Sequence, residues 1–62
     1  MSTMWIEFSL QEAPMDHIYY SDVSHLTYTP KHLKIYFKDG SKIKILESQL
    51  EDVSWGKDRK YL

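Results

Sequence analysis

The chain is 62 residues long, contains no cysteine and carries a net charge of −1 at pH 7. This length allows one domain at most, and the missing cysteines exclude disulfides and cysteine-ligated zinc as sources of stability. No run approaches the ~20 apolar residues of a membrane span, and Met1–Trp5 lacks the features of a secretory signal, so we expect a cytoplasmic protein without membrane contact.

The first predicted element is a half-buried strand over residues 4–10. Apolar side chains occupy alternate positions of this segment, which is the period-two pattern of a strand with one face on the core. Ile6 and Phe8 are therefore predicted in the core, and Trp5 is predicted on the opposite face beside Glu7.

The next segment is less regular. Residues 11–16 contain Pro14 and two acidic residues and are predicted to form a loop, with a short helix from Pro14 as the alternative. Residues 17–28 are rich in aromatic and β-branched side chains, which favours one bent strand or two short ones. A turn at residues 29–32 follows, because Pro30 presets the φ angle of its first central position.

The hairpin at residues 33–45 is the strongest structural signal. Apolar and polar residues alternate on both sides of Asp39-Gly40, which is a favoured turn pair. A two-residue loop would set lysines among the apolar side chains, whereas a three-residue loop with Gly40 in the left-handed conformation places each set on its own face. The predicted pairs are Leu33 with Ile45, Ile35 with Ile43, and Phe37 with Ser41.

A short C-terminal helix is predicted near residues 48–55. Ser48-Gln49-Leu50-Glu51 matches a capping box, apolar residues then recur at helical spacing, and Gly56 suits the C-terminus of a helix. Residues 57–62 are predicted to be a flexible tail.

The expected fold is one small domain over residues 1–62, of mostly β or α+β class. It would contain a small antiparallel sheet of three to five strands around the central hairpin, with the short C-terminal helix against it. The predicted core consists of Ile6, Phe8, Leu26, Tyr28, Leu33, Ile35, Phe37, Ile43, Ile45 and Leu50, with Val53 or Trp55 closing one end.

The charges are grouped along the chain. Residues 1–30 contain no Lys or Arg, whereas residues 31–46 contain five Lys and one Asp. Such blocks of opposite charge give information about binding partners and their orientation more than about the fold. The outer face of the predicted hairpin carries lysines interleaved with an aromatic ring. The candidate partner-binding residues are those of this face and one on the first strand: Lys34, Tyr36, Lys42, Lys44 and Trp5.

This face has more than one interpretation. Lysines beside an aromatic ring suit a phosphate backbone with bases stacked on the ring. Lysine is also common on a solvated sheet face, where it discourages pairing of strand edges. The acidic and basic blocks could equally pair with each other within the fold.

The sequence contains no defensible catalytic or metal-binding motif. His17, His25 and His32 have no ligand spacing and are interpreted as isolated surface residues. Gly40 and Gly56 are the only glycines, so a glycine-rich phosphate loop is excluded. We therefore expect no enzymatic activity, no cofactor and no metal site.

One stretch resembles a known family. Ser21–Pro30 followed by Leu33–Ser41 is similar to the strand, turn and hairpin core of the small KTSC domains. The shared features are mostly alternating apolar positions and an Asp-Gly turn, which any β-meander could show. The C-terminal portion of that family has no clear counterpart in Glu47–Leu62, and the resemblance implies no defined function.

Size, composition and the polar face together predict a non-enzymatic binding module that recognises a partner protein, as an accessory, adaptor or inhibitor. The first alternative is nucleic-acid binding through the Lys and Tyr side chains of the sheet. The second is a self-associating structural subunit, with an unpaired edge of the first strand forming a homodimer.

Overall fold

An antiparallel sheet forms most of the structure, a computed structural model that describes residues 4–57. In chain order the elements are β1 (Met4–Leu10), β2 (Ala13–Tyr28), β3 (His32–Phe37), β4 (Lys42–Leu46), the 3₁₀ turn η1 (Glu47–Gln49) and β5 (Leu50–Lys57). The five strands lie in the order β4-β3-β2-β1-β5. The predicted small antiparallel sheet is confirmed, in its mostly β form.

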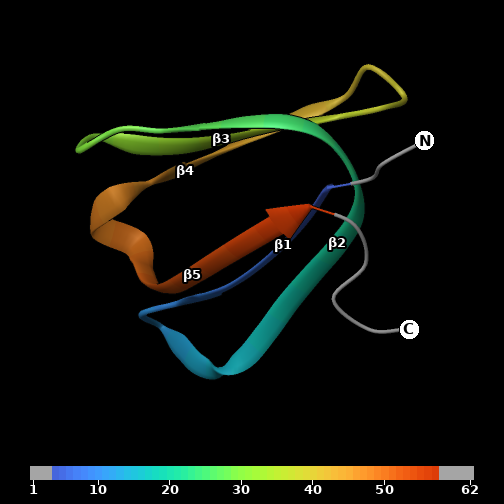
Figure 1. The fold of residues 1–62 in the computed structure, drawn as a ribbon. Helices are drawn as coiled ribbons and strands as arrows, with labels where there is room; N and C mark the ends of the chain where they lie inside the picture. The colour runs from blue at the N-terminus through green and yellow to red at the C-terminus, as the bar shows by residue number, and fades with distance from the viewer. Residues whose placement is uncertain (1–3, 58–62) are drawn as a thin grey trace.

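The long strand β2 belongs to both halves of the sheet. Its first part pairs with β1, where Ile18 lies opposite Phe8, and its last part pairs with β3, where Leu26 lies opposite Ile35. Figure 1 shows β2 curving between these two parts, so that the sheet turns over on itself and encloses its apolar face. The alternative of one bent strand is therefore confirmed.

The loop predicted at residues 11–16 is shorter than expected. Only Gln11 and Glu12 form the turn, because β2 begins at Ala13, which lies opposite Leu10. The alternative of a helix from Pro14 is wrong as well. Phe8 lies opposite Ile18 and Leu10 lies opposite Ala13, so β2 contains three more residues than β1 between these two pairs. This irregularity in the pairing accommodates the proline within the strand.

The register of the β3–β4 hairpin is the predicted one. Leu33 lies opposite Ile45 and Ile35 opposite Ile43. The Phe37 amide donates to the Ser41 carbonyl oxygen at 2.9 Å, and the Gly40 amide donates to the Phe37 carbonyl oxygen at 3.1 Å. Gly40 has a φ of 92°, as a three-residue loop with a left-handed glycine requires.

The predicted C-terminal helix is wrong. Only the 3₁₀ turn η1 forms, and the residues that follow it become β5, which pairs with β1 along its length. Ser9 lies opposite Asp52 while Leu10 lies opposite Leu50, so Glu51 is an extra residue in β5. This bulge gives Leu50 and Val53 the three-residue separation that resembles a helical spacing. Pairing with β1 satisfies backbone groups that a short helix would leave unpaired along that strand.

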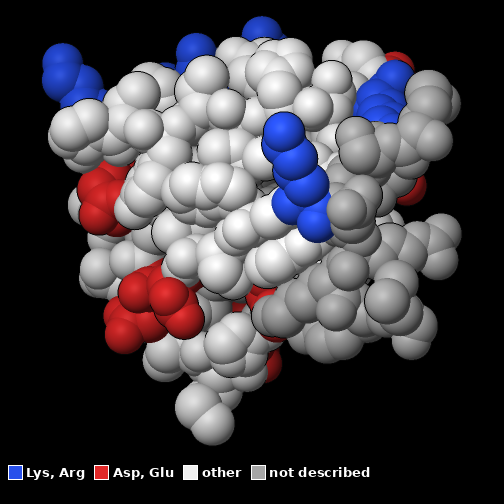
Figure 2. All heavy atoms as spheres, viewed as in Figure 1, with Lys and Arg blue, Asp and Glu red and all other residues white. Residues whose placement is uncertain are grey.

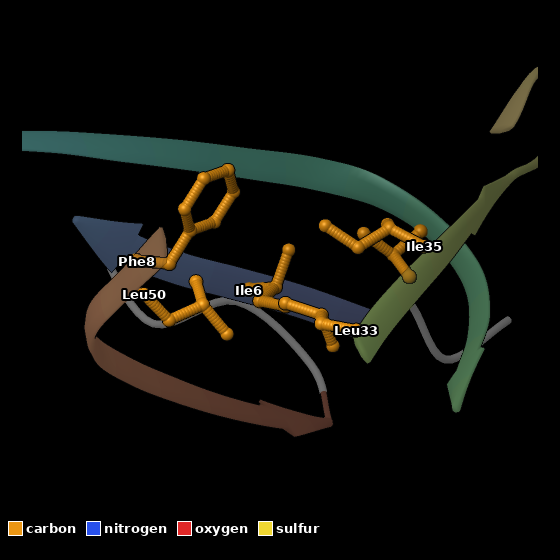
Figure 3. Close-up of a cluster of buried hydrophobic side chains, with 6 residues drawn as sticks. Ile6, Phe8, Leu33, Ile35 and Leu50 are labelled. Atoms are coloured by element: carbon orange, nitrogen blue, oxygen red, sulfur yellow. The ribbon is translucent and has the colours of Figure 1, made fainter. Parts of the chain in front are cut away.

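The core lies between the two halves of the sheet, and six apolar residues are buried there. Figure 3 shows the labelled side chains from β1, β3 and β5 pointing toward one another. Val23 is a core residue that the sequence analysis missed. The buried apolar set is Ile6, Phe8, Val23, Leu33, Ile35 and Leu50, with Leu26, Phe37, Ile43, Ile45 and Val53 partly buried against it.

Two aromatic residues predicted for the core lie at its margin instead. Tyr28 is 43% exposed and Trp55 is 40% exposed, and their rings meet edge to face at 5.6 Å. Both lie opposite buried residues, Leu33 and Ile6, and so belong to the inner face of the sheet. They remain partly exposed because Tyr28 ends β2 and Trp55 lies on the edge strand β5.

No helix within residues 4–57 has the length and apolar character needed to cross a membrane. Of the predicted tail, Lys57 is the last residue of β5, and residues 58–62 lie outside the described part of the chain.

Candidate binding face

The outer side of β3 and β4 brings four of the five predicted binding residues together. Lys34 and Tyr36 of β3 lie directly opposite Lys44 and Lys42 of β4. We call this surface, with His25 of β2, the basic face. Its position follows from the alternation of the hairpin, since burying Leu33 and Ile35 on one side of β3 turns the even-numbered residues to the other side.

His25 is the member of the basic face that the sequence analysis did not select as a binding residue. Its ring stacks on that of Tyr36, with centroids 4.3 Å apart and an angle of 14° between the planes. A bulge in β2 places it there, because Val23 lies opposite Phe37 while His25 lies opposite Tyr36. Strict alternation from a buried Val23 would have directed His25 inward, so sequence spacing alone could not have identified this contact.

Like charges are concentrated on the basic face. Lys34 and Lys44 form a direct cross-strand pair, and within residues 4–57 no carboxylate forms an ion pair with either of them. Like charges in this position destabilise a sheet. Partial desolvation, followed by the charges of Lys44, Lys34 and Lys31, lowers the pKa of His32 below its ordinary value of 6.5.

Basic and acidic side chains are only partly separated on the side of the molecule that Figure 2 shows. Basic side chains lie along the upper margin, where Figure 1 places β3 and β4, and groups of acidic side chains lie lower on the left. A further basic side chain lies near the centre, and acidic atoms adjoin the basic side chain at the upper right. One carboxylate, that of Glu47, accepts a hydrogen bond from the Tyr28 hydroxyl at 2.8 Å, which raises the pKa of Tyr28. The charges are therefore partly, but not fully, separated on this side of the molecule.

Trp5, the fifth predicted binding residue, lies on another part of the sheet. It belongs to β1, opposite Gly56 of β5, two strands away from β3. Its indole ring stacks on Tyr19 at 6.4 Å, and a Cβ built at Gly56 would stand 3.0 Å from the same ring. Trp5 thus packs over the β1–β5 pair and is not part of the basic face.

An apolar cleft lies beside the inner side of β4. Its volume is about 400 Å³, and its lining includes residues of the β1–β2 turn and of η1, which meet through a hydrogen bond from the Gln11 amide to the Gln49 carbonyl oxygen at 2.9 Å. The residues that line it include Ile43 and Ile45 of β4, Ile18 of β2 and the polar Gln49 of η1. The cleft and the basic face therefore share β4, one on each side of the strand.

The three histidines occupy separate places. His17 lies 3.9 Å from Glu7, His25 stacks on Tyr36, and His32 lies near the lysines. Residues 4–57 contain no group of three or more His, Cys, Asp or Glu side chains able to hold a metal ion. What the basic face can do chemically is hold anionic groups against its ammonium groups.

Comparison with known proteins gives no match, whether to a family model, to a curated protein or to a solved structure. The resemblance of the hairpin region to KTSC domains therefore has no family match behind it.

Proposed function

We propose that this domain is a non-enzymatic binding module that recognises an acidic surface of a partner protein through the basic face. The observation that carries the proposal is the direct pairing of Lys34 with Lys44, which the sheet holds together at a cost in stability. A carboxylate from a partner would relieve that repulsion, and complementary charge would guide the partner into register. The lack of cysteine fits a reducing compartment, and the cytoplasm is the location we propose.

Nucleic-acid binding is the second candidate, and the stack of His25 on Tyr36 beside the lysines favours it. Aromatic rings next to lysines can hold bases while the ammonium groups neutralise phosphates. Against it stands the overall charge, since nucleic-acid-binding domains are usually basic and this chain has a pI near 6.2.

The third possibility raised by the sequence is self-association through an unpaired edge of β1; that edge is not unpaired, and self-association by another route stays a prediction. β1 pairs with β2 on one side and β5 on the other, so it has no unpaired edge. The outer strands of the sheet are β4 and β5.

A capture experiment with charge-reversed variants tests the proposal. The tagged protein, the variant Lys42→Glu/Lys44→Glu and the control variant Lys38→Glu/Lys57→Glu would each be incubated with a lysate, with and without nuclease. The control changes net charge equally but leaves the paired lysines of β4 in place. Circular dichroism would confirm that all three proteins are folded.

The proposal expects a discrete protein that survives nuclease treatment, is lost with Lys42→Glu/Lys44→Glu and is retained with the control. Capture that nuclease abolishes would establish the nucleic-acid alternative, and its affinity would then fall steeply with added salt. Equal capture by both variants would remove the basic face from consideration.

A further inference from the structure

The outer edge of β4 carries unpaired backbone groups. Within residues 4–57, β4 pairs only with β3. The bond from the Phe37 amide to the Ser41 carbonyl sets the alternation of this antiparallel ladder. Bonded and non-bonded pairs alternate, so Ile43 and Ile45 direct their backbone groups to β3, and Lys42 and Lys44 direct theirs to the outer edge.

The side chains of β4 alternate in the other direction, between the two faces of the sheet. Lys42 and Lys44 are exposed on the basic face, and Ile43 and Ile45 are partly buried and line the apolar cleft. Phe8, Leu10 and Ile18 contribute apolar surface to the same cleft. A strand added at this edge would therefore send its own side chains alternately toward the lysines and toward the cleft.

We propose that β4 binds an extended segment of a partner protein as a sixth strand of the sheet, and that this segment alternates acidic and large apolar residues. The acidic side chains face Lys42 and Lys44, and the apolar ones enter the cleft beside Ile43 and Ile45. Main-chain bonds to Lys42 and Lys44 supply affinity, and the two sets of side chains supply specificity. This inference rests on the proposed function and specifies its partner.

The test uses a blocked synthetic peptide that alternates Glu and Leu, with a peptide that alternates Lys and Leu as control. Binding to the full chain is measured by isothermal titration, and amide hydrogen exchange is followed residue by residue. The expected result is binding of the Glu peptide only, with slower exchange at the amides of Lys42 and Lys44.

A pair of protein variants separates backbone pairing from charge. Lys44→Ala and Lys44→Pro remove the same ammonium group, but only proline removes the amide that faces the outer edge. Because that amide is not part of the β3–β4 ladder, both variants should fold. Lys44→Pro should bind the Glu peptide roughly two- to tenfold more weakly than Lys44→Ala, the effect of one lost hydrogen bond. Should Lys44→Pro not fold, peptides N-methylated on the amides facing β4 test the same bond.

Equal affinity of the two variants, unchanged exchange at Lys42 and Lys44, or no binding of the Glu peptide would each overturn strand addition. Equal binding of the Lys peptide would overturn the acidic pattern. If, without any peptide, these two amides exchanged slowly at high protein concentration, the edge would be assigned to a second copy of the chain. In each case, lysate capture that depends on Lys42 and Lys44 would leave the proposed function standing, so the two failures are distinguishable.

Discussion

Lys34 of β3 and Lys44 of β4 form a direct cross-strand pair. Within residues 4–57, no carboxylate forms an ion pair with either lysine. Opposite charges in such a pair stabilise a sheet, and like charges destabilise it. A domain selected only for stability would gain from an acidic residue at either position. Keeping both lysines together is consistent with a surface that meets its counter-charge in a partner.

Reversing one of these charges should therefore stabilise the isolated domain. We expect Lys44→Glu to raise the free energy of unfolding by roughly 0.2–1 kcal/mol at low ionic strength, because the repulsive pair becomes an attractive one. The gain should shrink with added salt. Thermal melts at two salt concentrations measure it, and Lys42→Glu, which lies opposite Tyr36, is the matched control with a smaller expected gain. A lower melting temperature for Lys44→Glu at low salt would contradict this account.

The opposed residues Ile35 and Ile43 should respond differently to the same truncation. Ile35 is fully buried, whereas Ile43 is only partly buried and lines the cleft. Ile35→Val should lower the free energy of unfolding by about 0.5–1.5 kcal/mol, and Ile43→Val by less, because the cleft already exposes part of its side chain. Urea denaturation of both variants gives the comparison, and equal losses would mean that the cleft is closed in solution.

Gly40 should resist replacement because of its backbone conformation alone. Its φ of 92° disfavours side chains, while a Cβ at this position would meet nothing within 4 Å. Gly40→Ala should therefore lose about 1–2 kcal/mol of stability, and Gly40→Asn less, since Asn tolerates the left-handed region better. Chemical denaturation checks the order. If the alanine variant matched the wild type, the three-residue loop would not persist in solution.

The lowered pKa of His32 predicts a loss of stability in mild acid. The ordinary pKa of His is 6.5, and above this pH the His32 imidazole is mostly neutral in both the folded and the unfolded chain. In that range its protonation does not reduce the free energy of unfolding. As the pH falls below 6.5, the unfolded chain binds the proton more readily than the folded chain, so unfolding becomes easier. The loss is complete once the pH lies below the folded pKa.

Comparison with His32→Gln isolates this effect from that of the other histidines. Urea midpoints measured from pH 7.5 to pH 5 should fall more for the wild type than for the variant. A steeper fall for the variant would show that desolvation and the nearby lysines do not disfavour the charged imidazole.

Two of the bulges in the sheet explain where inference from the sequence failed. A bulge adds one residue to a strand, so inward-facing residues that are normally two apart become three apart. Val23 and Leu26 in β2, and Leu50 and Val53 in β5, show this separation. In β5 it imitates a helical spacing, and in β2 it hides Val23 from the predicted core. The sequence of either segment does not show whether it forms a bulged strand, because the bulge is set by the register with the neighbouring strand.

By itself, the sequence determined β1, the register of the β3–β4 hairpin and the gathering of Lys34, Tyr36, Lys42 and Lys44 on one face. These rest on strict alternation and a local glycine turn, which are properties of neighbouring residues. Only the tertiary structure decided that Leu50–Lys57 is a strand, that His25 joins Tyr36, and that a cleft lies behind β4. Each of these depends on backbone groups far apart in the chain finding partners, and local pattern does not record that pairing.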